Sequence, residues 1–516
     1  MPIPNAQDGN VFSFPYTLWW GKSNPSGMNI SHIEASQLVF DTAHSPPQYY
    51  FNPVGIISWN LGASQFDGNM RMNLDTPTQF AINVSMVPAN GNGSLKLPLV
   101  QGMAFITGVY SGLTPSLTTV GHAILSFQKF GFSGANTKYK VNLNDGTTWL
   151  IYAFPSSGSF SLSQSGNSLV GNAQFNGYIQ IAKIPIGDSS SEAVYDSSAG
   201  TYVTSVRLFG SAVGSTGTYG FDFITAGTSN LPLHFALPHH QGSFDGPTQN
   251  AATNIHLRST TMGQMRAYRS NRWTLIESLP TNILFFPTGL QATDFSADTI
   301  SAIRAAAQAD IGINVSAESN LNSQYFAGKA IAKYAEICLV ANDILKDQGL
   351  TAMGLNKLKA AFSTFVNNQQ QAPLCYENTW KGLVSTAGFS DPGADFGNTY
   401  YNDHHFHYGY FVYAAALLGH IDPSWLTPTN VNYVNSLVRD VANPSDQDPF
   451  FPVFRSFDWF VGHSWSKGLF ASGDGKDEES SSEDYNFSYG MKLWGFVTKN
   501  PAMQACGDLM LAVQKR

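Results

Sequence analysis

Residues that could carry acid–base chemistry are concentrated in three stretches of the second half of the sequence. The first, Asp395–Tyr410, combines carboxylates, adjacent histidines and aromatic rings, and the second, Asp477–Asn486, is acidic and rich in serine. The third, Phe454–Trp465, lies between them and adds further Asp, His and Trp residues. Buried His and Asp are costly unless they are partnered, whereas the same residues suit the lining of a wet cleft. We therefore expect the three stretches to form one site with the chemistry of sugar-linkage cleavage.

Hydrolysis of a glycosidic bond needs a carboxylic acid that protonates the leaving oxygen. An inverting enzyme also needs a carboxylate that activates water on the other face of the sugar. Asp403 is the candidate acid, because aromatic neighbours such as Tyr401 and Phe406 would raise its pKa by disfavouring the charged form. The alternative is a loop aspartate that caps the helix predicted to follow it.

Glu479 and Glu483 are the candidates for the base. Four residues apart, they would point the same way on a helix. Two like charges so close raise one pKa and leave the other group ionised. The alternative is a solvated acidic loop, because further Asp and Glu residues crowd the same stretch. The sequence leaves open which glutamate is the base.

His404, His405 and His407 invite a metal site, because neutral imidazoles are good transition-metal ligands. Adjacent histidines rarely aim at one ion, however, and the sequence has no His-Glu-x-x-His pattern. We therefore expect these rings to hydrogen-bond to sugar hydroxyls or carboxylates, and we predict neither a metal nor a cofactor. The three cysteines lack the spacing of a zinc site, although their number allows one disulfide.

Aromatic side chains near these residues could stack against pyranose rings. Ordinary core packing is the alternative for each of them, and it is the commoner fate of a tryptophan. Together with polar neighbours, the candidates for substrate contact are Tyr401, His405, His407, Tyr408, Asp458, Trp459, His463, Trp465 and Trp380, and Tyr410 is a further candidate for stacking.

The elements that must position these residues change character along the chain. Up to about residue 250, alternating residues such as Phe80, Ile82 and Val84 predict short strands, separated by Gly, Ser and Asn clusters. From Ser296, an expected helix N-cap, apolar residues recur every three or four positions, as in amphipathic helices. We predict a β-sandwich domain over residues 1–250, a mixed connection over 251–295 and a helical domain over 296–516.

Several motifs resemble those of the endo-β-1,3-glucanases of glycoside hydrolase family 81. They are PYTLWW at Pro15–Trp20, ISHIEASQLVF at Ile30–Phe40, NLNSQYFAGKA at Asn320–Ala330, YENTWKGLVS at Tyr376–Ser385, FGNTYYNDHHFHYGYF, and FRSFDWFVGHSWSKGLFASGDGKDEESSSEDYN. The resemblance covers most of the chain. It implies a β-sandwich followed by an (α/α)6 barrel, and an endo-acting, inverting hydrolysis of β-1,3-glucan. It assigns the acid to Asp403 and points to Glu483 as the base with Glu479 as its helper. Because the family's barrel continues further, it also implies a barrel that is incomplete at residue 516.

Composition narrows the class of partner. Charged residues make up 12% of the chain and the net charge is −8, which suits a neutral partner and argues against nucleic acid. No apolar run reaches membrane-spanning length, and residues 1–15 lack the pattern of a signal peptide. The resemblance still implies an extracellular or cell-wall location, and we expect a monomer that binds β-1,3-glucan polysaccharide or oligosaccharide. Two alternatives remain: a glucan-binding protein left inactive by the shortened barrel, and a metal-dependent hydrolase built on the histidines.

Overall fold

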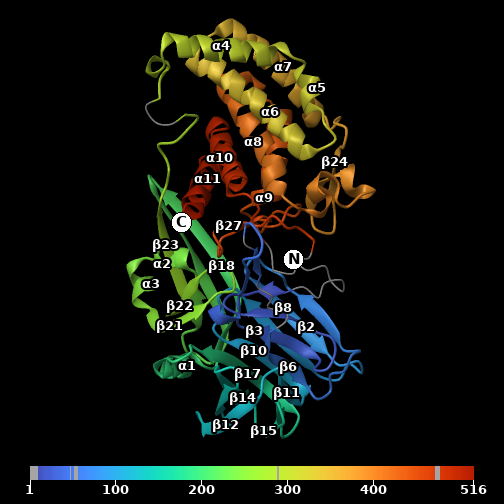
Figure 1. The fold of residues 1–516 in the computed structure, drawn as a ribbon, viewed down its shortest axis with the longest axis vertical. Coiled ribbons are helices and arrows are strands. Elements are labelled where there is room, and N and C mark those ends of the chain that lie inside the picture. The colour runs from blue at the N-terminus through green and yellow to red at the C-terminus, as the bar shows by residue number, and fades with distance from the viewer. Residues whose placement is uncertain (1–9, 47, 51–55, 287–289, 471–476) are drawn as a thin grey trace.

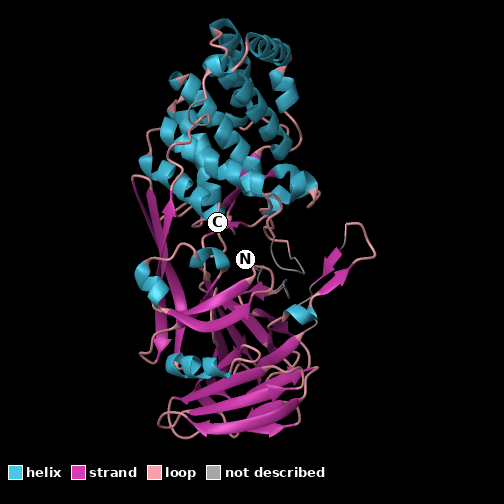
Figure 2. Cartoon of the chain, turned by 60° about the vertical axis from the view of Figure 1, so that its left-hand side comes forward, coloured by secondary structure: helices cyan, strands magenta, loops and turns pink. Residues whose placement is uncertain are grey.

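The computed structural model describes residues 10–46, 48–50, 56–286, 290–470 and 477–516. Sheets dominate the first part of the chain and helices the second, and the two parts lie one above the other (Figure 1, Figure 2). The change from strand to helix periodicity predicted from the sequence is thus confirmed. Residues 471–476, which belong to the last of the motifs quoted above, lie outside the described residues.

Two antiparallel sheets share one hydrophobic core at the N-terminal end. The first contains, in order, β1 (Val11–Phe12), β2 (Thr17–Gly21), β3 (Gly27–Ser31), β6 (Ile57–Ala63), β11 (Pro115–Val120), β16 (Ser168–Gly171) and β15 (Leu162–Ser165). The second contains β12 (Ile124–Gly131), β13 (Thr137–Leu143), β14 (Thr148–Pro155), β17 (Phe175–Ile184), β10 (Ile106–Leu113), β9 (Ser94–Val100), β8 (Ala81–Val87) and β7 (Arg71–Asp75). Alternate residues such as Tyr139, Val141 and Leu143 of β13 are buried, and apolar residues of both sheets meet in the same core. Period-two alternation in the sequence therefore reflects two sheets that pack face to face.

Strands continue well beyond residue 250. One smaller sheet is formed by β18 (Thr201–Val213), β19 (Thr216–Gly227) and β23 (Arg272–Ser278), and another by β20 (Leu233–Ala236), β22 (Gln264–Arg269) and β21 (Ala252–Arg258). Short helices α1 (Glu192–Ser198), α2 (Pro238–Gln241) and α3 (Gly246–Asn250) and the hairpin of β4 (Val39–Asp41) and β5 (Gln48–Tyr50) complete this part. Trp273, which is buried, lies in β23. Because β21, β22 and β23 all belong to sheets, the segment expected to be a mixed connection is sheet as far as Ser278.

The second part consists of helices and two short hairpins. The helices are α4 (Ala297–Gly312), α5 (Val315–Ser319), α6 (Gln324–Leu339), α7 (Gln348–Val366), α8 (His404–Ile421), α9 (Pro428–Ala442), α10 (Ser481–Val497) and α11 (Pro501–Gln514). The hairpins pair β24 (Leu374–Glu377) with β25 (Gly382–Ser385) and β26 (Phe457–Asp458) with β27 (His463–Ser464). Ser296 is confirmed as the N-cap of α4, because its side chain accepts a hydrogen bond from the Thr299 amide.

Helices α8 and α10 run side by side in the same direction. A Cβ atom added at Gly409 of α8 would lie 3.1 Å from the Phe487 Cα of α10, and one added at Gly490 of α10 would lie 3.0 Å from the Tyr413 amide nitrogen of α8. Both positions therefore need glycine for the two backbones to approach so closely. Along α8 the contacts come in the order Gly409, Tyr413, and along α10 their partners come in the order Phe487, Gly490. The two helices are therefore parallel, and their N-terminal ends are neighbours.

Helix α6 packs on α8 in the same sense. Gly328, early in α6, lies beside the backbone of His407, early in α8. Further along, Tyr413 of α8 donates a hydrogen bond to the Glu336 carboxylate of α6. Three parallel helices thus begin at one end of the helical part, each followed by a helix that packs on it: α7, α9 and α11. The positive ends of three helix dipoles converge there, which favours negatively charged groups.

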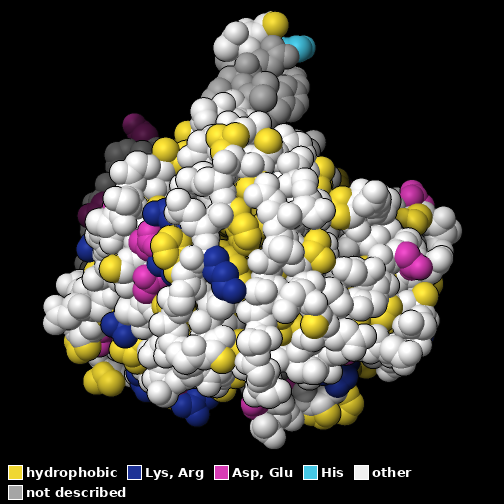
Figure 3. Space-filling model, turned by 90° about the horizontal axis from the view of Figure 1, so that it is seen from below, with side chains coloured by type: hydrophobic (Ala, Val, Ile, Leu, Met, Phe, Trp, Pro, Cys, Tyr) yellow, Lys and Arg dark blue, Asp and Glu magenta, His cyan; other side chains and the backbone are white. Residues whose placement is uncertain are grey.

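The surface carries few charged groups. On the face of the sheet region shown in Figure 3, Lys, Arg, Asp and Glu side chains are scattered among a larger area of other residues. None of the described helices is long and apolar enough to cross a bilayer.

Candidate active site

Asp403 occupies the position just before α8. Its backbone is left-handed, with φ of 54°, and its amide donates to the Ser466 carbonyl at 2.9 Å. Aspartate tolerates this conformation better than most residues, and strained residues are often found at functional sites. Its carboxylate makes no capping hydrogen bond to α8. The backbone of Asp403 therefore begins the helix, while its side chain is available for another role.

The surroundings of Asp403 keep its carboxyl group protonated at higher pH than usual. The residue is 7% exposed, and its Oδ1 atom has no hydrogen-bond partner among the described residues. Burial raises the pKa of Asp403 from 3.8 to about 6. His407 acts in the opposite direction and lowers this pKa, whereas the nearby charge of Glu479 also raises it. A carboxyl group in this state can donate a proton near neutral pH.

Glu483 lies in the first turn of α10 and is held on one side by two tyrosines. Its Oε1 atom accepts hydrogen bonds from the Tyr325 hydroxyl of α6 at 2.6 Å and from the Tyr410 hydroxyl of α8 at 2.5 Å. The Lys329 amino group lies 3.2 Å from the Tyr325 hydroxyl and 5.0 Å from the centre of its ring. Burial, together with the bond to Glu483, raises the pKa of Tyr325 to about 12, so the hydroxyl remains a donor. All three parallel helices thus contribute to the orientation of one carboxylate.

Glu479 is exposed and less constrained. Its amide donates to the Ser466 hydroxyl at 3.0 Å. The Ser466 carbonyl also accepts a hydrogen bond from the Asp403 amide. Ser466 therefore links the backbones of Asp403 and Glu479. The structure therefore brings Asp403, Glu479 and Glu483 to the same end of the helical part.

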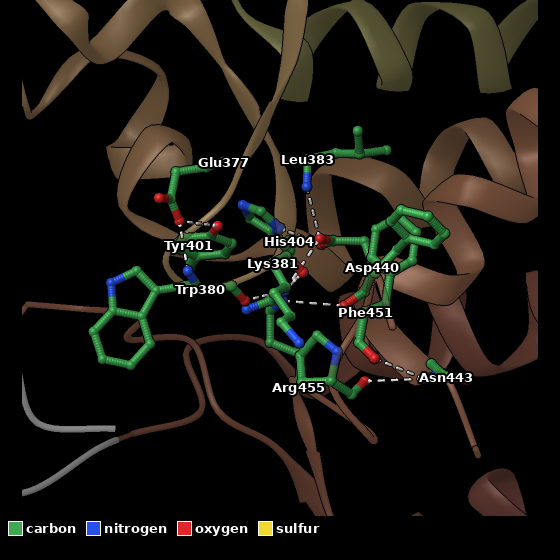
Figure 4. A network of polar contacts seen from close by, with 12 residues as sticks. Glu377, Trp380, Lys381, Leu383, Tyr401, His404, Asp440, Asn443, Phe451 and Arg455 are labelled. Atoms are coloured by element: carbon green, nitrogen blue, oxygen red, sulfur yellow. Dashed lines mark hydrogen bonds and ion pairs between the residues drawn. The ribbon is translucent and has the colours of Figure 1, made fainter. Parts of the chain in front are cut away.

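His404, the residue after Asp403, belongs to a buried ionic network with Asp440 and Arg455 (Figure 4). Its Nδ1 atom lies 2.5 Å from the Asp440 carboxylate and its Nε2 atom 2.8 Å from the Asn398 carbonyl. Each ring nitrogen thus faces an oxygen atom of another residue. Burial favours a raised pKa for Asp440, but the charges of Arg455 and His404 outweigh it and hold that pKa below its usual range. This network fixes the start of α8 against α9 and the β24–β25 hairpin.

His407 and Asp395 tie α8 to the start of α6. The His407 Nδ1 atom lies 3.6 Å from the Asp395 carboxylate. That carboxylate also accepts from the Ser323 hydroxyl at 2.5 Å and from the Gln324 amide at 2.8 Å, so it caps α6. Against the effect of burial, the nearby His407 and the hydrogen bonds from Ser323 and Gln324 hold the pKa of Asp395 below its usual range. His407 is fully buried, and its contact with substrate stays a prediction.

Three other residues that were predicted to contact substrate have rings that lie in the core. Tyr408 is 0% exposed and donates to the Leu383 carbonyl, and Trp459 is 2% exposed and packs against Phe454. His405 is also 0% exposed, and burial lowers its pKa to about 4, which keeps the ring neutral. Their burial favours the alternative of core packing, and their contact with substrate stays a prediction.

Two further predicted contacts are committed to protein partners. The Asp458 carboxylate accepts from the Gln101 side chain, from the Trp465 indole and from two backbone amides of its own turn. Tyr401 is 6% exposed, and its hydroxyl donates to Glu377 at 2.9 Å. Both residues support the site rather than face a ligand.

The remaining three candidates are partly exposed. Trp380 lies in the turn of the β24–β25 hairpin, and His463 and Trp465 contact each other with ring centres 4.7 Å apart. They stay candidates for substrate contact, beside Tyr410, whose hydroxyl is bound to Glu483.

Metal and disulfide chemistry find no support in the described part of the chain. No group of three or more His, Cys, Asp or Glu residues there has the geometry of a metal site. Cys338, Cys375 and Cys506 are all free thiols. The disulfide that their number allowed is therefore not formed.

The sequence did not single out several residues that shape the site. Tyr325 lies within the motif at Asn320–Ala330, where the pattern identified the stretch but not the tyrosine. Arg455 lies within the motif that begins at Phe454, where again the stretch was identified but not the residue. Asp440 and Gln101 belong to none of the motifs, and their partners are distant in sequence.

Two known protein-domain families match the chain, one over its sheet part and one over its helical part. Residues 4–289 match the glycosyl hydrolase family 81 N-terminal domain, and residues 294–516 match the C-terminal domain of that family. A solved family 81 glycoside hydrolase from Clostridium thermocellum superposes with a TM-score of 0.78 over 99% of this chain and 69% of its own, at 20% identity, which shows a shared fold.

Three curated relatives are named glucan endo-1,3-beta-D-glucosidases. The primary septum glucan endo-1,3-beta-D-glucosidase of Schizosaccharomyces pombe is 45% identical over 98% of this chain and 50% of its own length. Glucan endo-1,3-beta-D-glucosidases of Arthroderma benhamiae (42% identity, 99% of this chain, 58% of the relative) and Saccharomyces cerevisiae (37%, 98% and 66%) are similar. The chain thus spans between half and two thirds of the length of these relatives. Because both family domains match over nearly all of its residues, the chain belongs to glycoside hydrolase family 81.

Proposed function

We propose that this chain hydrolyses internal linkages of β-1,3-glucan with inversion at the anomeric carbon. The observation that carries the proposal is the buried Asp403, whose pKa is raised to about 6 near the exposed Glu479, at the same end of the helices as the fixed Glu483. A protonated acid next to carboxylates is the pair that glycosidic-bond hydrolysis needs. Three relatives are named glucan endo-1,3-beta-D-glucosidases, which supports β-1,3-glucan as the substrate class.

In the proposed reaction Asp403 gives its proton to the leaving glucosyl oxygen as the C1–O bond breaks. Glu483 takes a proton from the water whose oxygen attacks C1 from the opposite face. The products are a shortened chain with a free hydroxyl and a new reducing end in the α-configuration. Because a water molecule must fit between base and sugar, the two carboxyl groups should lie about 6.5–9.5 Å apart in the working enzyme.

Contacts favour Glu483 over Glu479 as the base. Tyr325 and Tyr410 bind the same oxygen, Oε1, so Oε2 is the atom left to receive the proton from water. Glu479 is exposed, and its charge contributes to the raised pKa of Asp403. We therefore assign Glu479 the role of helper, which keeps Asp403 protonated.

The proposal includes an architecture and a setting. Three parallel helices, each followed by a helix packed on it, are compatible with part of an (α/α)6 barrel behind a β-sandwich. The proposed domains are a sheet domain over residues 1–250, a connection over 251–295 whose strands end at Ser278, and a helical domain over 296–516. A primary septum relative supports an extracellular or cell-wall location. We expect the chain to act as a monomer on glucan, without nucleic acid or membrane.

Release of reducing sugar from laminarin, with and without a chelator, tests the proposal. We expect activity that survives the chelator and that Asp403→Asn and Glu483→Gln each nearly abolish, with glucan binding retained. Glu479→Gln should cost less. Proton NMR of freshly released sugar should show the α-anomer first. Binding without release would instead support a glucan-binding protein, loss with chelator would support a metal-dependent hydrolase, and a β-anomer would contradict inversion.

A further inference from the structure

We infer that Gln101, a residue of the N-terminal sheets, positions Trp465 in the active site by way of Asp458. The inference rests on the function proposed above, because it gives Trp465 the role of a surface for a glucosyl ring. It assigns the sheet region a direct part in substrate binding, although every candidate residue found from the sequence lies in the helical part.

One carboxylate oxygen joins the two parts of the chain. The Gln101 side-chain amide, just after β9, donates to Asp458 Oδ2 at 2.7 Å, and the Trp465 indole N–H donates to the same atom at 3.0 Å. An indole has a single donor, so this bond decides how the ring is turned about its side-chain axis. A shift of Oδ2 therefore reorients Trp465.

The other carboxylate oxygen is anchored within the β26–β27 turn. Asp458 Oδ1 accepts from the amides of Phe460 at 2.9 Å and Val461 at 3.2 Å. The carboxylate can still rotate about its own axis with these bonds in place, because backbone amides accept small changes of angle. Gln101 supplies the second fixed point, and hydrogen bonds to a charged acceptor are stronger than neutral ones.

The loop that carries Gln101 is itself held in place. Gly102 has a left-handed backbone with φ of 80°, and its amide and carbonyl form hydrogen bonds with Ser13 and Phe235, each at 2.6 Å. A Cβ atom at Gly102 would lie 2.9 Å from the Phe460 ring, so the loop packs directly on the β26–β27 turn. Gln101 therefore projects from a rigid base toward Asp458.

Trp465 lies next to the proposed chemistry. The following residue is Ser466. Its carbonyl accepts a hydrogen bond from the Asp403 amide, and its hydroxyl accepts one from the Glu479 amide. These bonds do not involve the Trp465 ring, and they remain when the ring turns. Loss of the Gln101 contact should therefore weaken binding of the sugar more than the chemical step.

A double-substitution cycle tests the inference in the full chain. Binding to laminarin is measured by affinity electrophoresis, and kcat and KM by reducing-sugar release, for Gln101→Met, Trp465→Phe and the pair combined. Gln101→Met should weaken laminarin binding and raise KM about tenfold, with kcat within about twofold. The double variant should bind as Trp465→Phe does, because both changes act on the same ring. Gln65→Met is the matched control, since Gln65 is another half-buried glutamine whose bonds stay within the sheets.

Additive effects of the two substitutions, or a Gln101→Met variant that behaves as Gln65→Met does, would overturn the inference. Should Gln101→Met not fold, Gln101→Asn, whose amide is one methylene too short to reach Asp458, is expected to give the same loss of binding. Laminarin binding is measured without turnover, so a parent chain that binds but releases no sugar would refute the proposed activity and leave this test intact.

Discussion

Replacing Asp403 with asparagine should stabilise the folded chain at neutral pH while removing its activity. Burial and the charge of Glu479 raise the pKa of Asp403 from 3.8 to about 6. A group whose pKa is higher in the folded state binds its proton more tightly there, so its ionised form destabilises the fold. Above about pH 6 the parent chain must hold a buried, charged carboxylate, whereas asparagine carries no charge.

The size of the gain follows from the same values. One tenfold step in a protonation equilibrium corresponds to about 1.4 kcal/mol, so the difference between 3.8 and about 6 corresponds to about 3 kcal/mol. The gain should be absent below about pH 4, where both folded and unfolded chains are protonated, and should grow as the pH rises through about 6. For a helical part of roughly 220 residues it predicts a melting temperature about 6–12 °C higher at pH 8.

Thermal unfolding followed by far-ultraviolet circular dichroism at pH 4 and pH 8 measures this effect. Asp391→Asn is the matched control, because Asp391 is an exposed aspartate in the loop before α8 and its replacement should change little at either pH. A gain of equal size at both pH values would trace the effect to packing rather than charge. A loss of stability at pH 8 would refute the assignment of Asp403 as a buried acid.

The pKa of Asp403 also predicts that kcat/KM for laminarin falls as the pH rises above about 6, since the proton donor is then lost; a rate that keeps rising to pH 8 would contradict it. Tyr325→Phe and Tyr410→Phe should each lower kcat about tenfold or more, because each removes a hydrogen bond that orients the Glu483 carboxylate. Tyr413→Phe, which alters a bond to a different carboxylate on the same helices, should leave kcat nearly unchanged. Asp440→Asn should lower the melting temperature at neutral pH, the opposite of Asp403→Asn, because its carboxylate is paired with buried cations; an unchanged value would show that the network contributes no stability.

Local patterns were sufficient for the class of structure, and they pointed to the stretches where we propose the chemistry to take place. Alternation over the first half required strands, and three- and four-residue spacing after Ser296 required helices, because each periodicity places one face in a core. The N-cap at Ser296 is a local interaction between neighbouring residues, so it too follows from the sequence. The concentration of carboxylates around Asp403 and Glu483 marked the site for the same reason: residues close in sequence cannot lie far apart in space.

Local patterns were not sufficient to separate lining residues from core residues. Helix α8 is buried on nearly every side, so its sequence has no separate polar face. Without such a face, the sequence could not show whether Tyr408, His405 and His407 lie in the core or line the site. Trp459 was predicted to contact substrate, yet its neighbours in space include Tyr219, which is remote in sequence. Whether a ring stacks on sugar or fills a core depends on what covers it.

Residue types, their order and their placement on strands or helices all follow from local features of the chain. Tertiary structure decided that Gly409 and Gly490 let α8 and α10 approach in parallel, which brings Asp403 and Glu483 to one end. It also decided that Tyr325 from α6 and Gln101 from the sheets take part in the site. The physical reason is that these are contacts between segments tens to hundreds of residues apart. Their geometry is set by close packing of whole elements, and no short stretch of sequence records it.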